Sequence, residues 1–198
     1  FNFFNRTVLL GVDSAPIDVA VSNNQVSILK HAVPFNETLL LFSDFSQFRL
    51  SAAQLLTPET VSIDVATRFE ASLNAKPVGA GKYVYFPTQQ GAFSGLREYY
   101  VDTDTETNDA IEVTGHVPNY IKGTIKHMAA SSNENMIIVQ TDDDPTKVYV
   151  YRYYWSGRDK LQSSWSTWTF SGKVRYFDFD KSDIYFVVQY GDTLALER

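Results

Sequence analysis

The amino-acid sequence predicts an all-β fold, and two observations carry this prediction. The chain of 198 residues holds 14 Phe, 12 Tyr and 3 Trp but only 2 Met, and aromatic and β-branched side chains favour the pleated surface of a strand. Strand-like segments also recur in pairs, and equivalent positions at Leu39, Tyr83, Met136 and Ile184 are 44, 53 and 48 residues apart. Repeats of about 40–50 residues with several strands each are typical of propeller blades. We therefore expect a β-propeller-like fold of four-stranded antiparallel blades, with a β-sandwich as the alternative.

This repeat divides the chain into four blade-like units. They cover approximately residues 22–70, 71–117, 121–170 and 172–198, within a single propeller-type domain, or part of one, that spans residues 1–198. The chain begins with Phe1 rather than Met, and the last unit ends after its third strand. We therefore expect a piece of a longer protein.

The first 70 residues read as short strands separated by turns. Breaks at residues 13–16 and 22–24 are rich in Asp, Ser, Asn and Pro, which favour turns. The residues between and after these breaks predict strands at 7–10, 17–21, 26–33, 38–42, 47–50 and 60–70. Residues 51–56 are the best local candidate for a helix, of one or two turns.

The remaining chain repeats one plan of paired strands with further strands between the pairs. The predicted pairs are residues 82–86 with 96–101, 135–139 with 147–151, and 183–187 with 194–196. Additional strands are expected at 110–117, 124–130, 165–170 and 174–180. They are placed by their position, two after a pair and two before one, as the remaining strands of a blade.

One hairpin, residues 145–170, dominates this second part. Its first arm is nearly continuous in aromatic and β-branched residues, and Ser156, Gly157 and Asp159 supply turn chemistry. Its second arm places large rings among small hydroxyl residues in the order Trp-Ser-Thr-Trp-Thr-Phe. Because such rings bury about 150–250 Å² each, we expect Trp165, Trp168 and Phe170 to anchor one unit against its neighbour.

Charge and cysteine content exclude several classes of function. The net charge of −6 argues against a face that binds phosphates, which needs clustered Lys and Arg. The sequence has no Cys, so disulfides, thiol catalysis and Cys-ligated zinc are excluded. No apolar run approaches the roughly 20 residues of a membrane helix, so we expect no membrane segment.

Residues 102–109, Asp-Thr-Asp-Thr-Glu-Thr-Asn-Asp, begin like a calcium-binding loop. An EF-hand loop needs Gly at its sixth position and an acidic residue at its twelfth. Here these positions are Thr107 and Val113, while Glu112 falls one residue short. The spacing therefore predicts a solvated acidic loop, and the Asp142-Asp143-Asp144 run predicts a polar turn.

Two glycine-containing segments also fail as sites. Residues 79–82, Gly-Ala-Gly-Lys, lack the first Gly of a phosphate-binding loop and are followed by Tyr83 rather than Ser or Thr. Residues 91–95 place Ser94 one position late for a nucleophile elbow and predict a flexible hairpin loop.

The spacing of the histidines and of the basic residues matches no metal-binding or nucleic-acid-binding motif either. His31, His116 and His127 lack any metal-binding motif. The basic residues Lys147, Arg152, Arg158 and Lys160 alternate with rings from Tyr149 to Trp155, as in some single-strand binders. Because these rings occupy both faces of a predicted strand, packing is the expected role. We therefore predict no catalytic, cofactor-binding or metal-binding residue, no cofactor, and no enzymatic activity.

Several segments, taken in order, resemble one known family. They are residues 57–61 (TPETV), 76–86 (KPVGAGKYVYF), 116–121 (HVPNYI), 145–151 (PTKVYVY) and 162–170 (QSSWSTWTF). In number, order and approximate spacing they resemble the tail tubular protein B, or nozzle protein, family of T7-like short-tailed bacteriophages. The resemblance covers the chain from about Leu55 to its end.

The resemblance implies a structural virion protein, assembled in the host cytoplasm and located in the phage tail. Members of the family form a homo-hexameric ring with a β-propeller-like platform at the distal end of the tail tube. The implied partners are copies of the same chain, the tail adaptor protein, the tail fibres and, transiently, the exiting genomic DNA. The alternative functions are a carbohydrate-binding or polysaccharide-degrading β-propeller and a protein-interaction propeller unrelated to phages.

Overall fold

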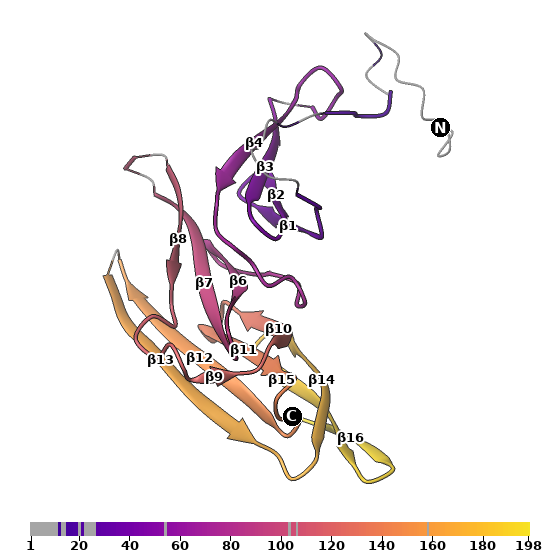
Figure 1. Cartoon of the computed structure of the whole chain (residues 1–198), viewed down its shortest axis with the longest axis vertical. Helices are drawn as coiled ribbons and strands as arrows, with labels where there is room; N and C mark the ends of the chain where they lie inside the picture. Colours follow the sequence, from indigo (N-terminus) through magenta and orange to yellow (C-terminus); the bar gives the residue numbers. More distant parts are fainter. Residues whose placement is uncertain are drawn as a thin grey trace. The chain divides into compact units, whose positions relative to one another are not determined.

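The computed structural model describes most of the chain. The described residues are 12, 15–19, 21, 27–53, 55–102, 104–105, 107–157 and 159–198. The chain divides into two compact units, Phe1–Glu70 and Ala71–Arg198. Each unit is built of antiparallel sheets (Figure 1), and the described ranges contain no helix.

The first unit contains one four-stranded sheet. Its strands are β1 (His31–Phe35), β2 (Thr38–Phe42), β3 (Gln47–Ala52) and β4 (Val61–Thr67), in the order β1-β2-β3-β4. Asn36 and Glu37 join β1 to β2 with φ angles of 39° and 42°. Positive φ at both residues of a two-residue turn matches the right-handed twist of the flanking strands. The core of this sheet is formed by the buried side chains of Val33, Phe35, Leu40, Leu41, Phe42 and Phe48.

Gln47 fixes the chain that follows the last strand of this sheet. Its side chain is fully buried. The amide oxygen accepts hydrogen bonds from the Thr67 hydroxyl at 2.7 Å and the Phe69 N–H at 3.3 Å, and the amide nitrogen donates to the Phe69 carbonyl at 3.0 Å. A buried amide needs such partners, because an unsatisfied one costs about 1–3 kcal/mol.

The predicted helix at residues 51–56 is wrong. Ser51 and Ala52 end β3 and pair with Ser62 and Val61 of β4. An isolated helix of one or two turns is marginal because nucleation is costly, whereas pairing with β4 gives these residues ladder hydrogen bonds. Among the strands predicted before β1, residues 7–10 lie outside the described part, and residues 17–19 form no strand.

The second unit contains three successive sheets. The first has β5 (Val78–Ala80), β6 (Tyr83–Gln90), β7 (Phe93–Asp102) and β8 (Thr107–Glu112) in that order, and β9 (Ile121–Lys122) pairs with the start of β7. The second has β10 (Ile125–Ser131), β11 (Met136–Thr141), β12 (Lys147–Ser156) and β13 (Asp159–Thr169). The third has β14 (Lys173–Asp180), β15 (Asp183–Tyr190) and β16 (Thr193–Glu197).

The β10–β13 sheet lies between the other two sheets of this unit. Because side chains alternate along a strand, its strands bury residues on both faces. One face packs on the β5–β8 sheet and contributes Ile137, Val139, Tyr149 and Tyr151 to a core shared with Tyr85 and Leu96. The other face packs on the β14–β16 sheet and contributes Met136, Ile138, Val148 and Val150 to a core shared with Phe177, Phe186 and Val188.

The first strands of the three sheets are neighbours. β10 lies beside both β5 and β14, and each sheet then runs outward from its first strand in sequence order (Figure 1). The prediction of an all-β fold with four-stranded antiparallel sheets is confirmed, and the arrangement is consistent with blades. Two sheets differ from the expected four strands, since β9 adds to the first and the last has three.

The expected anchoring role of Trp165, Trp168 and Phe170 is confirmed, and it extends to both neighbouring sheets. The Trp165 indole N–H donates to the Val113 carbonyl, which follows β8, at 3.1 Å. Trp168 and Phe170 contact Phe186 of β15, with ring centroids 6.2 and 4.8 Å apart. Because Trp165 and Trp168 are three positions apart on a strand, they point to opposite faces.

Candidate functional site

A buried ion pair joins the first two sheets of the second unit. Glu98 of β7 is only 1% exposed, and the Lys160 side chain of β13 is 18% exposed. The Lys160 ammonium donates to both Glu98 carboxylate oxygens, at 2.8 and 2.7 Å. Such charge-assisted hydrogen bonds are roughly twice as strong as those between neutral groups.

Strand register brings the other members of this cluster to the ion pair. Tyr85 of β6 lies directly opposite Glu98, and its hydroxyl donates to the same carboxylate at 2.6 Å. Trp155 of β12 lies opposite Lys160, whose ammonium is 4.8 Å from the Trp155 ring centroid. That distance is within the range of a cation–π contact. The ion pair is therefore held by side chains from four strands.

Aromatic rings shield the ion pair from water. Tyr83 and Trp155 stack at 5.2 Å with an interplanar angle of 10°. Tyr153 contacts both Tyr85, at 5.9 Å, and Tyr151, at 5.8 Å. Exclusion of water strengthens the attraction between Glu98 and Lys160, although removing both charges from water costs free energy.

Several tyrosines of this cluster have raised pKa values, because burial disfavours the charged phenolate. Burial, followed by the negative charge of Glu98, raises the pKa of Tyr85 well above its usual range. Burial also raises the pKa of Tyr151, against a lowering effect of its hydrogen bond with Ser163. Burial and the Glu98 charge raise the pKa of Tyr153 to about 12. These hydroxyls therefore stay protonated at neutral pH, and that of Tyr85 donates its hydrogen bond to Glu98.

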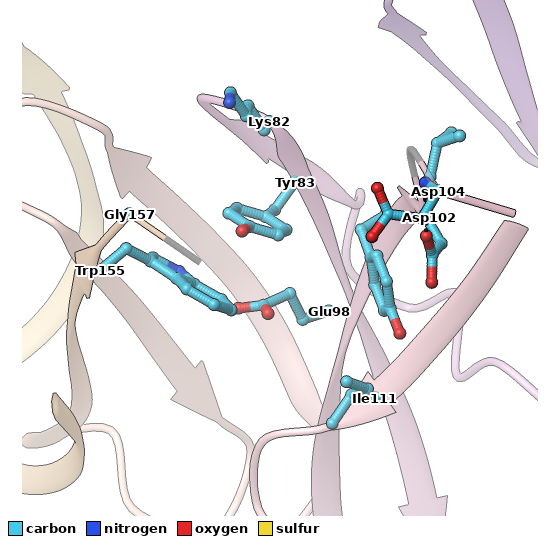
Figure 2. Close-up of a pocket in the computed structure, with 10 residues that line it drawn as sticks. Lys82, Tyr83, Glu98, Asp102, Asp104, Ile111, Trp155 and Gly157 are labelled. Atoms are coloured by element: carbon cyan, nitrogen blue, oxygen red, sulfur yellow. Dashed lines mark hydrogen bonds between the residues drawn. The ribbon is translucent and has the colours of Figure 1, made fainter. Parts of the chain in front are cut away.

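A pocket of about 340 Å³ opens beside this cluster. Its walls include Tyr83, Glu98, Tyr100, Asp102, Asp104 and Trp155. In Figure 2 the Tyr83 ring lies along the Trp155 indole, and Asp102 and Asp104 lie on the side of the pocket away from Trp155.

Two carboxylates of this pocket, Glu98 and Asp102, form structural contacts. Glu98 is bound by Lys160 and Tyr85. One Asp102 oxygen accepts the backbone N–H groups of Asp104 and Thr105, at 2.8 and 3.2 Å, and so shapes the turn after β7. Sugar hydrolysis requires one carboxyl group to donate a proton and a second to act as base or nucleophile. The contacts of Glu98 and Asp102 instead hold sheets and turns together.

The acidic and glycine-containing segments are likewise parts of the scaffold. In the acidic segment, Asp102 ends β7 and β8 begins at Thr107, while Thr103 and Glu106 lie outside the described residues. Residues 79–82 lie in β5 and the following turn, where Gly81 has a φ of 61°. The expected flexible loop at residues 91–95 is wrong in part, because β7 begins at Phe93. Ser94 is buried there, and its hydroxyl donates to the Gly123 carbonyl at 2.7 Å.

The three histidines lie in separate elements of the chain. His31 is in β1, and His116 is in an exposed turn. The ring of His127 lies between two sheets, with Nε2 at 2.7 Å from the Phe177 carbonyl oxygen. Among the described residues, no three His, Asp or Glu side chains are placed to hold a metal ion. In the same part of the chain, no helix has the length and apolarity needed to span a bilayer.

The basic residues of the long hairpin do not form one group either. Lys147 and Arg152 are in β12, where Lys147 is 3.8 Å from the Asp144 carboxylate. Arg158 lies outside the described residues. Of the three that the structure describes, Lys160 is the one that joins the aromatic cluster. Glu98 was not predicted as a site residue, because strand alternation in the sequence does not reveal which faces of two sheets meet.

Comparisons with known proteins agree with this structural character. The model of one family, described as bacteriophage nozzle protein, matches residues 1–198. The tail tubular protein gp12 of Escherichia phage T7 is 36% identical over 192 residues, which cover 96% of this chain and 24% of that protein. This chain therefore spans about a quarter of the length of its T7 relative.

A solved structure titled "Complex of KlAtg21 with coiled-coil of AgAtg16" gives a TM-score of 0.39 at 9% identity, over 91% of this chain and 69% of that one. This similarity is too low to support a conclusion. The nozzle model, in contrast, matches the chain from its first residue to its last. The chain therefore belongs to the bacteriophage nozzle protein family.

Proposed function

We propose that this chain is a structural part of a bacteriophage tail. In the full-length protein it would contribute to a homo-hexameric nozzle at the distal end of the tail tube, in the virion. The observation that carries the proposal is the match of the nozzle family model to residues 1–198. The T7 relative is named as a tail tubular protein, which supports the same location.

The geometry supports a rigid wall rather than a reaction centre. The first two sheets of the second unit are tied across their faces by the Glu98–Lys160 ion pair and the Trp165–Val113 hydrogen bond, and ring contacts of Trp168 and Phe170 with Phe186 join the third. A wall that guides DNA must also release it, and each phosphate neutralised by Lys or Arg strengthens binding. The net charge of −6 therefore suits a channel for genome ejection.

The succession of four sheets, β1–β4, β5–β8, β10–β13 and β14–β16, supports consecutive blades in one propeller-type domain, or part of one. In this proposal the blades cover approximately residues 22–70, 71–117, 121–170 and 172–198. The proposed partners are copies of the same chain, the tail adaptor protein, the tail fibres and, transiently, exiting DNA. Assembly would occur in the host cytoplasm.

The proposed role is not enzymatic. Glu98, the most buried carboxylate of the pocket, is occupied by Lys160 and Tyr85, and the family membership does not favour a polysaccharide-degrading propeller. Purified protein should therefore release no reducing sugar from capsular polysaccharide and no muropeptide from peptidoglycan. Turnover that is abolished by replacing one pocket carboxylate would contradict this part of the proposal.

Electron microscopy of virions tests the tail role directly. Virions that carry the full-length protein should show a six-fold ring at the distal end of the tail, into which the two sheet-bearing units can be fitted. A map with this chain in the head, or virions that lack the protein and still eject their genome, would overturn the proposal.

A further inference from the structure

The strand β13 is the outer strand of the sheet that packs between the other two sheets of the second unit. It has 11 residues, of which eight are exposed and three are half-buried. Among the described residues, β12 is the only strand with which it pairs. The other edge of β13 therefore presents a row of backbone N–H and C=O groups that no described strand pairs.

The pairing of β13 with β12 is regular along most of its length. From Gln162 to Thr169, each residue of β13 lies opposite one residue of β12 without a break in register. The shift in this pair lies next to the hairpin turn, between Tyr154 and Trp155. A bulge within the strand would twist its edge away from a partner. The regular register leaves the edge of β13 straight enough to accept another strand.

The edge of β13 also lacks the charges that protect the outer strands of the two preceding sheets. The outer strand β4 carries Asp64 at its centre, and the outer strand β8 carries Asp109 and Glu112. Residues 161–169 of β13, in contrast, contain no charged side chain. Charged side chains are one means by which native proteins prevent edge strands from pairing with other chains. Of these three outer strands, β13 is therefore the one suited to pairing.

The side chains of this edge strand are mostly small and carry hydroxyl groups. Between and beside the two tryptophans lie Ser163, Ser164, Ser166, Thr167 and Thr169, all of them exposed. Small side chains allow a neighbouring strand to approach, and hydroxyl side chains can form hydrogen bonds with those opposite them on an adjacent strand. The partner strand would therefore be uncharged, with hydroxyl or β-branched side chains.

We propose that the free edge of β13 pairs with a strand of a neighbouring copy of the same chain, so that the sheet continues from one subunit into the next. This inference rests on the proposed homo-hexamer. Each copy of this chain carries a net charge of −6, so copies repel each other where their acidic side chains meet. Strand addition uses backbone hydrogen bonds, and the uncharged edge of β13 is a strip on which two copies can approach without this repulsion.

The strand that pairs with β13 belongs to a different part of the neighbouring copy. Pairing of β13 with β13 would be an isologous contact, which closes a two-fold dimer. A six-fold ring instead needs a heterologous contact, in which two different surfaces meet. Each subunit would therefore offer β13 to one neighbour and a second strand to the other.

Amide hydrogen exchange of the full-length protein, as monomer and as assembled ring, tests the proposal without any substitution. The amides of β13 should exchange at least about tenfold more slowly in the ring, because those on the free edge gain hydrogen bonds. The amides of β11, which is buried along its whole length, should be protected in both forms. Those of the charged outer strand β8 should exchange equally in both. Equal exchange of β13 in monomer and ring would overturn the proposal.

A pair of matched substitutions tests the edge itself. Thr167 on β13 and Thr107 on β8 are both exposed threonines of outer strands. Thr167→Lys should raise the protein concentration needed for ring assembly by at least about tenfold, because a lysine on an edge opposes strand pairing, whereas Thr107→Lys should leave it unchanged. Both should leave the melting temperature of the monomer almost unchanged, since exposed substitutions usually have small effects. Equal assembly of the two variants would contradict the proposal.

Other partners of β13 would give different exchange patterns. Protection of β13 in the monomer would mean that another part of the same chain covers the edge, and protection only in complete tails would mean that a different tail protein does so. A dimer that protects β13 would indicate pairing of two β13 strands. Each of these results would overturn the inference. Failure of the full-length protein to form any ring would also overturn the proposed hexamer, whereas a ring with unprotected β13 would overturn this inference alone.

Discussion

Lys160 and Glu98 are 62 residues apart in the sequence, yet the Lys160 ammonium lies 2.7 and 2.8 Å from the two Glu98 carboxylate oxygens. The contact joins β13 of one sheet to β7 of the preceding sheet. Tyr85 and Trp155 complete the surroundings of the two charges. The ion pair therefore fixes the position of one sheet relative to the next.

Replacing Lys160 by Met should destabilise the protein by about 3 kcal/mol, because it leaves the Glu98 carboxylate buried without its cation. Urea unfolding followed by tyrosine and tryptophan fluorescence measures the loss. The double variant Glu98→Gln, Lys160→Met should recover most of it, since removal of both charges is often close to neutral.

The matched control is Lys126→Met. The Lys126 ammonium is 3.4 Å from the Asp142 carboxylate, but both side chains are nearly half exposed, at 48% and 47%. Exposed ion pairs contribute about 0–1 kcal/mol, so this variant should unfold almost as the parent does. If both single variants lose the same stability, the Glu98–Lys160 pair has no special role.

Much of the fold could be predicted from the sequence because strands and turns are local signals. The pairs around Tyr83, Met136 and Ile184 correspond to β6 with β7, β11 with β12, and β15 with β16. The helix predicted at residues 51–56 was wrong. The helical pattern of this short segment is weak, and the pairing of β3 with β4 decides its conformation instead.

The candidate cluster could not be predicted from the sequence, because strand alternation does not reveal which faces meet. Glu98 is followed by two tyrosines and Lys160 follows Asp159 next to a turn, so each alone resembles a solvated charge. Only the stacking of two sheets places them together. Trp165 and Trp168 were predicted to pack against one neighbouring unit. Because they are an odd number of positions apart on a strand, they point to opposite faces and contact two different sheets.

Truncation of Trp168 to Ala should cost about 1–3 kcal/mol, below the range for a fully buried ring. The ring is half-buried and contacts Phe186 of the following sheet at 6.2 Å. Thermal unfolding measures the change. Leu161→Ala on the same strand, at a side chain that is 67% exposed, should change the melting temperature little. An unchanged melting temperature for Trp168→Ala would place the ring outside the inter-sheet contact.

Stability should fall as the pH rises from 10 towards 12. Burial and the Glu98 charge raise the pKa of Tyr153 from 10.0 to about 12. Below pH 10 both states keep the proton. Between these values the unfolded chain releases it while the folded protein retains it, so the unfolded state is favoured. The urea midpoint, measured at about pH 9 and about pH 11, should therefore decrease.

The adjacent tyrosines provide the variant and its control for this pH dependence. Tyr153 is 5% exposed, whereas Tyr154 is 52% exposed. Tyr153→Phe should reduce the alkaline loss without abolishing it, because Tyr85 and Tyr151 also have raised pKa values. Tyr154→Phe should show the same decrease of the urea midpoint at alkaline pH as the parent protein. Identical pH dependence for the two variants would contradict the assignment to Tyr153.

The isolated chain should bind duplex DNA weakly and without sequence preference. Its net charge is −6, and two lysines that could contact phosphates are engaged by aspartates. Lys122 is 2.9 Å from Asp143, and Lys126 is 3.4 Å from Asp142. A specific reader would present Arg or Asn side chains into a groove on a helix or ribbon, and a phosphate binder loses affinity steeply as salt displaces it.

Titration with duplexes of unrelated sequence, at low and at physiological salt, measures this property. Binding should be weak at low salt and undetectable at micromolar protein in physiological salt, for every duplex. Sub-micromolar affinity that persists at physiological salt would mean that the chain grips DNA, because a wall that holds phosphates so tightly would slow passage of the genome. In the proposed six-copy ring such contacts would be multiplied, so even moderate affinity of the single chain would argue against a passive channel.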